Sequence, residues 1–390
     1  MRLILPCSPI DNGAMPWDLF CRVVDNFGDI GVCWRLAAQL AEQGQLVRLW
    51  VDDASALRWM APQHEATHPL VAVNDWAAAA GDAAPLPGEV VIEAFGCDPP
   101  PAFVARMAAQ HRRTGKQPVW INLEYLSAEL YAERNHRLPS PQASGPAAGL
   151  VKHFFFPGFS EGSGGLLREP DLQQRHRDFE PAAWLQSMGI ALLPREQAFS
   201  LFCYPAAPLA QLIEALSNGN GNGNDQPIAM LATAGAASAA LSELLGPSLQ
   251  RGAVRAVMLP WLTQRDYDHL LWSCDVNWVR GEDSAVRAQW AGRPFVWQLY
   301  PQSDGADRPK ADAFLRRFFE PSVRSAEPQL ESAVTGMWQH WNGWQATEPD
   351  WTLMLGDRSS WQAQCLAWRR YLRSQPDLLS RLTAFVSEVR

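Results

Sequence analysis

The chain has 390 residues, which at roughly 100–200 residues per domain indicates two or three domains. Apolar residues make up 47% of it and charged residues only 19%, so the chain can bury large cores and is not a polar, disordered protein. The formal net charge of −8 argues against a general nucleic-acid-binding protein, which needs a basic surface to neutralise phosphates, and we expect no nucleic-acid partner.

Cysteines, histidines and apolar runs exclude several further classes. The seven cysteines are scattered, no pair has C-x-x-C spacing, and no cluster with the eight histidines has zinc-ligand spacing. We therefore expect that the cysteines are free thiols, that the protein resides in the reducing cytoplasm, and that it has no metal site. The chain lacks a run of about 18 apolar residues, and Pro, Asp and Asn interrupt its N-terminal apolar stretch, so we expect neither a membrane span nor an export signal. Residues 1–14 are expected to be a disordered extension or a start-site artefact.

Strands and helices alternate along the first part of the chain, as in a parallel α/β sheet. The apolar run LFCRVV (19–24) is typical of a buried strand, the loop DNFGD (25–29) follows it, and apolar residues at helical spacing predict a helix over 30–42. The next expected elements are strands over 46–51, 69–73 and 89–95, a helix over 101–110, and strands over 118–123 and 152–156.

A second series of the same kind follows a stretch rich in Gly, Pro and charged residues. Its strands are expected over 199–204, 228–233, 253–259, 276–279 and 295–299, its helices over 208–216, 237–245, 265–273 and 284–291, and the pattern beyond 311 is helical. We therefore predict an α/β protein with two Rossmann-like domains that face each other. The expected divisions are 1–165 for the first domain, 166–190 for a linker and 191–370 for the second domain, with a C-terminal helix over 371–390 that packs back on the first domain.

Ligands of such sheets bind at the carboxyl ends of the strands, and two facing domains form a deep cleft there. Asp25 and Asp29 lie directly after the first strand, and Gly28 allows close approach of a ligand to the backbone. An alternative for Asp29 is a cap of the helix expected to begin at Ile30, and taken alone that alternative is the stronger. Asp25 is harder to explain in this way, because a carboxylate directly after an apolar strand needs a partner.

The segment RGEDS (280–284) also follows a strand. Ser284 is placed to cap the helix over 284–291, whose N-terminus would offer N–H groups and a positive dipole end to a diphosphate. Glu282 and Asp283 suit sugar hydroxyls better than phosphate, because like charges repel. The alternative is a solvated acidic turn with a serine cap. The following GRP and the strand PFVWQLYPQ resemble the nucleotide-sugar site of glycosyltransferases with the two-Rossmann, or GT-B, fold.

Aromatic residues form a third candidate group, because flat rings at strand ends can stack on a base. Each ring taken singly is better explained by core packing, and their shared position at the carboxyl ends of second-domain strands is what favours binding. The group, with one polar neighbour, consists of Phe202, Tyr204, Trp261, Gln264, Tyr267 and Tyr300.

Four longer segments, VVDNFGDIGVCWRLA, INLEYLSAE, FPGFSEGSGGL and VRGEDSAVRAQWAGRPFVWQLYPQ, resemble the bacterial protein-arginine rhamnosyltransferase family. The resemblance runs from about Trp17 to the C-terminus. It implies an inverting, metal-independent GT-B glycosyltransferase without a cofactor, which takes L-rhamnose from dTDP-β-L-rhamnose and places it on one arginine of translation elongation factor P. The resemblance further implies that this modification activates the factor for the rescue of ribosomes stalled at polyproline. The first domain would then bind the acceptor protein and the second domain the donor.

The same resemblance implies roles for individual residues. Asp25, Asp29 and Glu282 match the family's key acidic positions, and Asp29 would be the general base. The donor site would consist of Asn26, Phe27, Gly28, Phe202, Tyr204, Trp261, Gln264, Tyr267, Arg280, Gly281, Glu282, Asp283, Ser284 and Tyr300. Two alternatives stay open: a GT-B enzyme with a glycan or small-molecule acceptor, and a two-domain small-ligand-binding protein without catalysis. We expect a cytoplasmic protein with no membrane partner.

Overall fold

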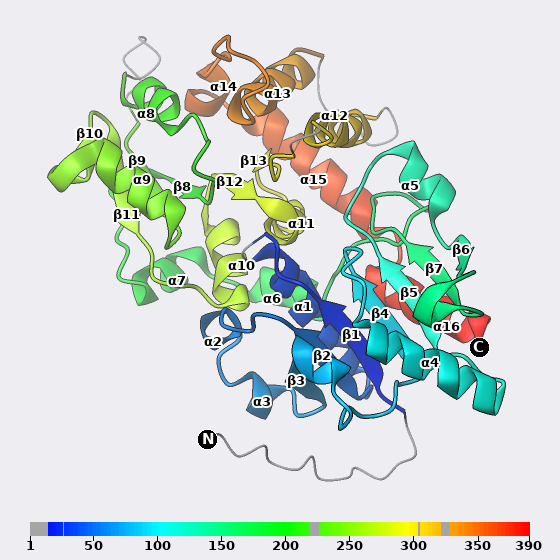
Figure 1. Cartoon of the computed structure of the whole chain (residues 1–390). Helices are drawn as coiled ribbons and strands as arrows, with labels where there is room; N and C mark the ends of the chain where they lie inside the picture. Colours follow the sequence, from blue (N-terminus) through cyan, green and yellow to red (C-terminus); the bar gives the residue numbers. More distant parts are fainter. Residues whose placement is uncertain (1–14, 26, 219–225, 303–304, 321–327) are drawn as a thin grey trace.

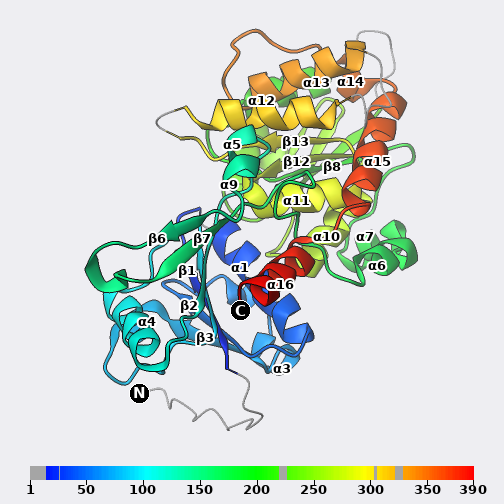
Figure 2. The same ribbon diagram turned by 90° about the vertical axis from the view of Figure 1, so that its right-hand side faces the viewer.

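The computed structural model describes residues 15–25, 27–218, 226–302, 305–320 and 328–390. Two sheets dominate it, and Figures 1 and 2 show them one above the other, each with helices around it. The sequence-based prediction of two Rossmann-like α/β units in tandem agrees with this arrangement.

The first sheet is built from seven strands: β1 (Trp17–Cys21), β2 (Val47–Val51), β3 (Val71–Asp75), β4 (Val90–Ala94), β5 (Val119–Leu123), β6 (Pro139–Pro141) and β7 (Val151–Phe155). Their spatial order is β3-β2-β1-β4-β5-β7-β6, and all pairs are parallel except β6 with β7. Its helices are α1 (Gly28–Glu42), α2 (Leu57–Met60), α3 (His64–Thr67), α4 (Pro101–Thr114) and α5 (Leu130–Asn135), with short 3-10 turns η1 (Trp76–Ala80) and η2 (Gly145–Ala147).

Successive side chains of β1 enter two different cores. Leu19 packs in the cluster that contains Ile30 of α1, whereas Phe20 packs with Phe103 of α4 on the opposite face. A strand buried on both faces has a continuous apolar run, which explains why these strands are recognisable in the sequence.

The linker holds two short helices, α6 (Leu172–Asp178) and α7 (Pro181–Ser187). The second sheet has six strands: β8 (Gln197–Leu201), β9 (Ile228–Ala232), β10 (Gln250–Arg251), β11 (Val254–Met258), β12 (Val276–Arg280) and β13 (Phe295–Gln298). Their order is β10-β11-β9-β8-β12-β13, parallel except for the pair β10 and β11. The helices of this part are α8 (Leu209–Asn218), α9 (Ala236–Leu245), the 3-10 turn η3 (Gly246–Ser248), α10 (Gln264–Ser273), α11 (Gly281–Ala291), α12 (Asp307–Phe318), α13 (Pro328–Trp341) and α14 (Thr352–Leu355).

The last two helices connect the two sheets. Helix α15 (Ser359–Arg373) contributes Trp361 and Trp368 to the core of the second sheet. Helix α16 (Leu378–Val389) contributes Leu382 and Phe385 to the core of the first sheet, and Figure 2 shows it beside α1. The C-terminal end of the chain therefore packs against the N-terminal sheet.

Each sheet has a switch point at which the strand order reverses. β1 lies between β2 and β4, and β8 lies between β9 and β12. Open α/β sheets bind ligands at the carboxyl ends of the strands that flank such a point. The loops after β1, β4, β8 and β12 are therefore where the site is built.

Candidate active site

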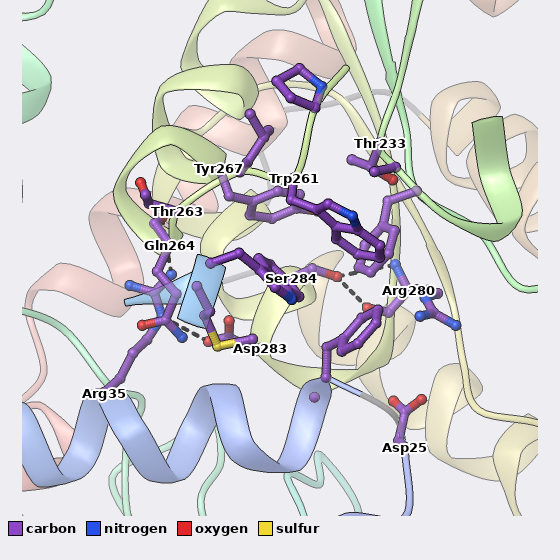
Figure 3. A pocket seen from close by; sticks show the side chains of 18 residues that line it. Asp25, Arg35, Thr233, Trp261, Thr263, Gln264, Tyr267, Arg280, Asp283 and Ser284 are labelled. Atoms are coloured by element: carbon purple, nitrogen blue, oxygen red, sulfur yellow. Dashed lines mark hydrogen bonds and ion pairs between the residues drawn. The ribbon is translucent and has the colours of Figure 1, made fainter. Parts of the chain in front are cut away.

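Two adjoining cavities lie where the loops after these strands meet. Their cavity volumes are about 80 Å³ and about 530 Å³, and the second lies within the range of common small-ligand sites. Asp25 and Gly28 line both of them. The first, called the aromatic cavity, is lined by Phe27, Trp59, Phe202, Trp261, Tyr267 and Arg280 among others (Figure 3). The second, called the acidic cavity, is lined by Asp25, Asp29, Tyr125, Glu282, Tyr300, Asp307 and Lys310 among others.

Asp29 is a buried carboxylate in the wall of the acidic cavity, with 4% of its surface exposed. Its Oδ2 accepts hydrogen bonds from the backbone N–H groups of Val24 (2.8 Å) and Asp25 (2.9 Å). Burial raises the pKa of Asp29, with further upward contributions from the charges of Asp25 and Glu282, and outweighs the lowering effect of the two hydrogen bonds. The helix-cap alternative is wrong, because α1 begins at Gly28 and the carboxylate binds the preceding loop instead of helical N–H groups.

Asp25 joins the two halves of the molecule. Its Oδ2 accepts a 2.6 Å hydrogen bond from the hydroxyl of Tyr204, which follows β8. Burial and the neighbouring Asp25 charge raise the pKa of Tyr204, so this hydroxyl remains a donor. Gly281 has a φ of +66°, and a Cβ there would lie 2.7 Å from Asp25 Oδ2, so only glycine allows this close approach. Within the described part of the chain, the other oxygen, Oδ1, is buried without a hydrogen-bond partner.

Arg280 ends β12 and lies across two aromatic rings. Its guanidinium carbon is 4.5 Å from the ring centre of Phe202 and 4.4 Å from that of Tyr204. Ser284 accepts a 3.1 Å hydrogen bond from the backbone N–H of Arg280 and donates to the Arg280 carbonyl. The predicted role of Ser284 as the N-cap is wrong, because α11 begins at Gly281 and Ser284 lies within its first turn.

Glu282 is held at both carboxylate oxygens. Its Oε2 accepts a 2.8 Å hydrogen bond from the backbone N–H of Leu126, which follows β5, and its Oε1 lies 2.5 Å from the ammonium of Lys310 in α12. The first contact comes from the opposite sheet. Glu282 therefore bridges the two domains within the acidic cavity.

Asp283 lines the aromatic cavity but is also engaged by a cation of the first domain. Its Oδ1 accepts a 3.0 Å hydrogen bond from Nε of Arg35. Nη1 of the same arginine lies 3.0 Å from Oε1 of Glu169. Burial raises the pKa of Asp283, although Arg35 and Arg287 act in the opposite direction. The cluster of interdomain charges around this pair includes Arg35, Glu169, Arg175, Asp268, Asp283 and Arg287.

The aromatic cavity brings rings together from both domains. Trp261, which is 48% exposed, lies with its ring centre 5.5 Å from that of Phe27 and 4.8 Å from that of Trp59. Tyr267 contacts Phe202 in an edge arrangement at 5.8 Å. Gln264 donates a 2.9 Å hydrogen bond to the carbonyl of Gly31 in α1.

The structure thus divides the predicted donor residues between two cavities. Tyr300, Gly281 and Glu282 line the acidic cavity, while Tyr204 is in the lining of neither cavity and contacts Asp25. Asn26 lies outside the described residues. The remaining predicted residues line the aromatic cavity: Phe27, Gly28, Phe202, Trp261, Gln264, Tyr267, Arg280, Asp283 and Ser284.

Several lining residues were not predicted. Thr233 and Phe95 directly follow β9 and β4, so the strand-end rule that located Asp25 applies to them as well. Trp59 in α2 and Lys310 in the first turn of α12 carry no such signal, because neither helix begins at a strand end.

The described residues contain no group of three or more His, Cys, Asp or Glu side chains with an arrangement that could hold a metal ion. None of the helices in this part of the chain has the length and apolar character that crossing a membrane requires.

Comparisons with known proteins identify relatives of the whole chain. The profile of the family described as elongation factor P (EF-P) rhamnosyltransferase EarP matches residues 17–387. A protein-arginine rhamnosyltransferase of Pseudomonas putida is 42% identical over 95% of this chain and 98% of its own length. One of Neisseria meningitidis serogroup B is 38% identical over 95% of this chain and 96% of its own length.

Solved structures are similar to this chain over nearly its full length. A structure described as the basis for EarP-mediated arginine glycosylation of translation elongation factor EF-P is similar with a TM-score of 0.64 and 31% identity, over 96% of this chain and 100% of that one. A glycosyltransferase of Rickettsia africae shares only the fold, with a TM-score of 0.52 and 8% identity over 97% of this chain and 99% of that one. The predicted GT-B fold with two facing Rossmann-like domains is confirmed.

Proposed function

The chain belongs to the elongation factor P rhamnosyltransferase family, and from this premise we propose that it transfers L-rhamnose from dTDP-β-L-rhamnose to an arginine side chain of translation elongation factor P. In this proposal the transfer is a single displacement that inverts the anomeric carbon, needs neither metal nor cofactor, and takes place in the cytoplasm. The product would be the form of the factor that rescues ribosomes stalled at polyproline.

The proposal rests on the close approach of Asp25, in the loop after β1, to the start of α11. The 2.6 Å hydrogen bond from Tyr204 and the close approach of Gly281 hold this carboxylate where the aromatic and acidic cavities join. An enzyme that moves a sugar from a nucleotide to a cation needs a donor pocket and an acidic acceptor pocket that share one boundary. In this proposal the aromatic and acidic cavities are that pair.

The aromatic cavity suits the nucleotide. Trp261 offers an exposed ring for stacking on the base. Arg280 and the N-terminus of α11 supply positive charge at the neighbouring wall, where a diphosphate would lie. As the sugar leaves, negative charge develops on the diphosphate, and these groups would stabilise it without reorganisation.

The acidic cavity suits the acceptor. An arginine guanidinium is always charged and is a poor nucleophile, so it must be oriented and deprotonated as it reacts. Asp25 and Glu282 would bind the guanidinium fork, so Glu282, which the family resemblance assigns to the donor site, would act on the acceptor side. One guanidinium nitrogen would then attack the anomeric carbon, the bond from that carbon to the diphosphate oxygen would break, and Asp29 would take the nitrogen's proton. The raised pKa of Asp29 makes its carboxylate a stronger base than an ordinary aspartate.

Product analysis tests this mechanism. Purified protein is incubated with elongation factor P and dTDP-β-L-rhamnose, and the rhamnosyl linkage is examined by NMR. We expect an α-linked rhamnose on an arginine nitrogen, since one displacement inverts the β donor. A β-linked product would rule out the single displacement. Transfer to a glycan or small molecule in place of the protein would favour a GT-B enzyme of different specificity.

A further inference from the structure

A lysine occupies the cavity in which the proposed acceptor arginine would bind. The ammonium of Lys310 lies 2.5 Å from Glu282 Oε1, and both side chains are largely buried. Among the described residues, the lining of the cavity includes four carboxylates, those of Asp25, Asp29, Glu282 and Asp307, and one ammonium, that of Lys310. A cavity with this excess of negative charge attracts a cation, and Lys310 provides one from within the chain.

The same ammonium also lies near an aromatic platform. It is 5.6 Å from the ring centre of Tyr125, which is 39% exposed and lines the acidic cavity. Phe95 supports this ring from behind, since the two are stacked with centres 4.6 Å apart. A carboxylate beside the face of a rigid ring is a site that suits a flat guanidinium better than a point-like ammonium.

We propose that Lys310 is an internal competitor for the acceptor guanidinium: it pairs with Glu282 in the free enzyme and is displaced when the acceptor arginine binds. This inference rests on the proposed function. Glu282 would keep its place during the exchange, because its other oxygen remains bonded to the backbone N–H of Leu126. Lys310 can leave, because it stands in the first turn of α12 on a flexible stem and its ammonium makes one point-charge contact with Glu282.

The competing interpretation is that Lys310 positions Glu282 for catalysis. The two interpretations predict opposite changes when the lysine is removed. An internal competitor weakens acceptor binding, so its removal should lower the KM and the Kd for the acceptor. A positioning residue supports turnover, so its removal should lower kcat and leave acceptor binding unchanged or weaker.

The experiment compares the wild type with Lys310→Met and with Lys116→Met, which removes the same charge from an exposed position in the loop before β5. Titration calorimetry gives the Kd for elongation factor P without donor, and steady-state transfer gives KM and kcat. We expect Lys310→Met to lower both Kd and KM by about three- to fivefold, the upper range for a partly screened ion pair, without a fall in kcat. Lys116→Met should leave both constants within about twofold of the wild type.

An unchanged or raised Kd in Lys310→Met would overturn the inference, and so would a fall in kcat at unchanged KM. Thermal unfolding of the variant checks that it is folded, and Lys310→Gln provides a second variant if methionine disturbs the cavity. A wild-type protein that fails to rhamnosylate the factor would contradict the proposed function itself. The ratio of Kd values between variant and wild type, measured without turnover, tests Lys310 separately.

Discussion

The hydroxyl of Tyr204 donates a 2.6 Å hydrogen bond to Oδ2 of Asp25 and so joins the loop after β8 to the loop after β1. The second oxygen of Asp25 is buried and has no hydrogen-bond partner among the described residues. A buried carboxylate oxygen without a partner is unfavourable, so this oxygen is suited to accept a hydrogen bond from a bound cation. The contact thus links the packing of the two domains to the orientation of one acidic group.

Replacement of Tyr204 by phenylalanine removes this hydrogen bond and keeps the ring beneath Arg280. A hydrogen bond to a charged group is worth about 1.5–3 kcal/mol, so we expect kcat/KM for rhamnosyl transfer to fall by roughly 10–100-fold. Steady-state kinetics measures this change. Tyr131→Phe in α5 is the matched control and should leave kcat/KM unchanged. Equal losses in both variants would show that the hydrogen bond from Tyr204 to Asp25 does not contribute to transfer.

Asp29→Asn should nearly abolish transfer, because an amide cannot take the proton of the acceptor nitrogen. General-base catalysis contributes roughly 10²–10⁴-fold, and we expect a loss of kcat in that range. The pH profile provides a second test. The base must be ionised and burial raises its pKa above 3.8, so kcat/KM should fall as the pH drops through this raised pKa, at higher pH than for an ordinary aspartate. A kcat/KM that falls only below pH 3.8, or a fully active Asp29→Asn variant, would exclude Asp29 as the base.

The same pKa shift predicts the stability of this variant. A carboxyl whose pKa is higher in the folded than in the unfolded state destabilises the fold at pH values above its unfolded pKa, and this penalty disappears at lower pH. Asp29→Asn should therefore be at least as stable as the wild type at neutral pH, since its amide oxygen can still accept from the N–H groups of Val24 and Asp25. Asp29→Ala should be less stable, because both donors lose their partner. Urea unfolding at pH 7 compares the three proteins.

Trp261→Ala should weaken the binding of dTDP. Stacking of a base on an aromatic side chain is worth about 1–3 kcal/mol, so we expect the Kd to rise by roughly 5–100-fold. Trp261→Phe should retain most of the affinity because it keeps a ring at this position. Titration calorimetry with dTDP alone measures both variants. An unchanged Kd in the alanine variant would show that the base does not bind at this exposed indole.

Arg35→Met should destabilise the interdomain charge cluster. Arg35 is 5% exposed and lies 3.0 Å from both Glu169 and Asp283. Removing one partner leaves buried charges without compensation, and we expect the free energy of unfolding to fall by about 3 kcal/mol. Arg137→Met removes the exposed ion pair with Glu388 and should cost less than about 1 kcal/mol. Equal effects in denaturant unfolding would contradict the structural role of the cluster.

The sequence was sufficient to predict the fold and much of the site for a physical reason. Strands buried on both faces have short apolar runs, and in parallel sheets the polar residues that follow them gather at one edge. That rule made Asp25, Asp29 and the segment 280–284 candidates, the family resemblance favoured them, and the structure places all of them at the two cavities. Their chemical roles remain predictions.

The sequence did not reveal contacts between distant segments. Arg35 and Asp283 are 248 residues apart in the chain, and Glu282 and Leu126 are 156 apart. No periodicity of a single sequence reports such pairs. The start of α11 was also predicted wrongly, because Ser284 before an apolar run matches the pattern of an N-cap, whereas the helix already begins at Gly281.

The mass of elongation factor P shows whether the protein transfers rhamnose to it. The factor is incubated with this protein and dTDP-β-L-rhamnose, and the intact protein and its peptides are analysed by mass spectrometry. We predict the addition of one rhamnosyl group, located on a single arginine and lost when that arginine is replaced by lysine. An unmodified factor under conditions in which the protein binds dTDP would contradict the proposed transfer and favour a protein that binds the nucleotide sugar without transferring it.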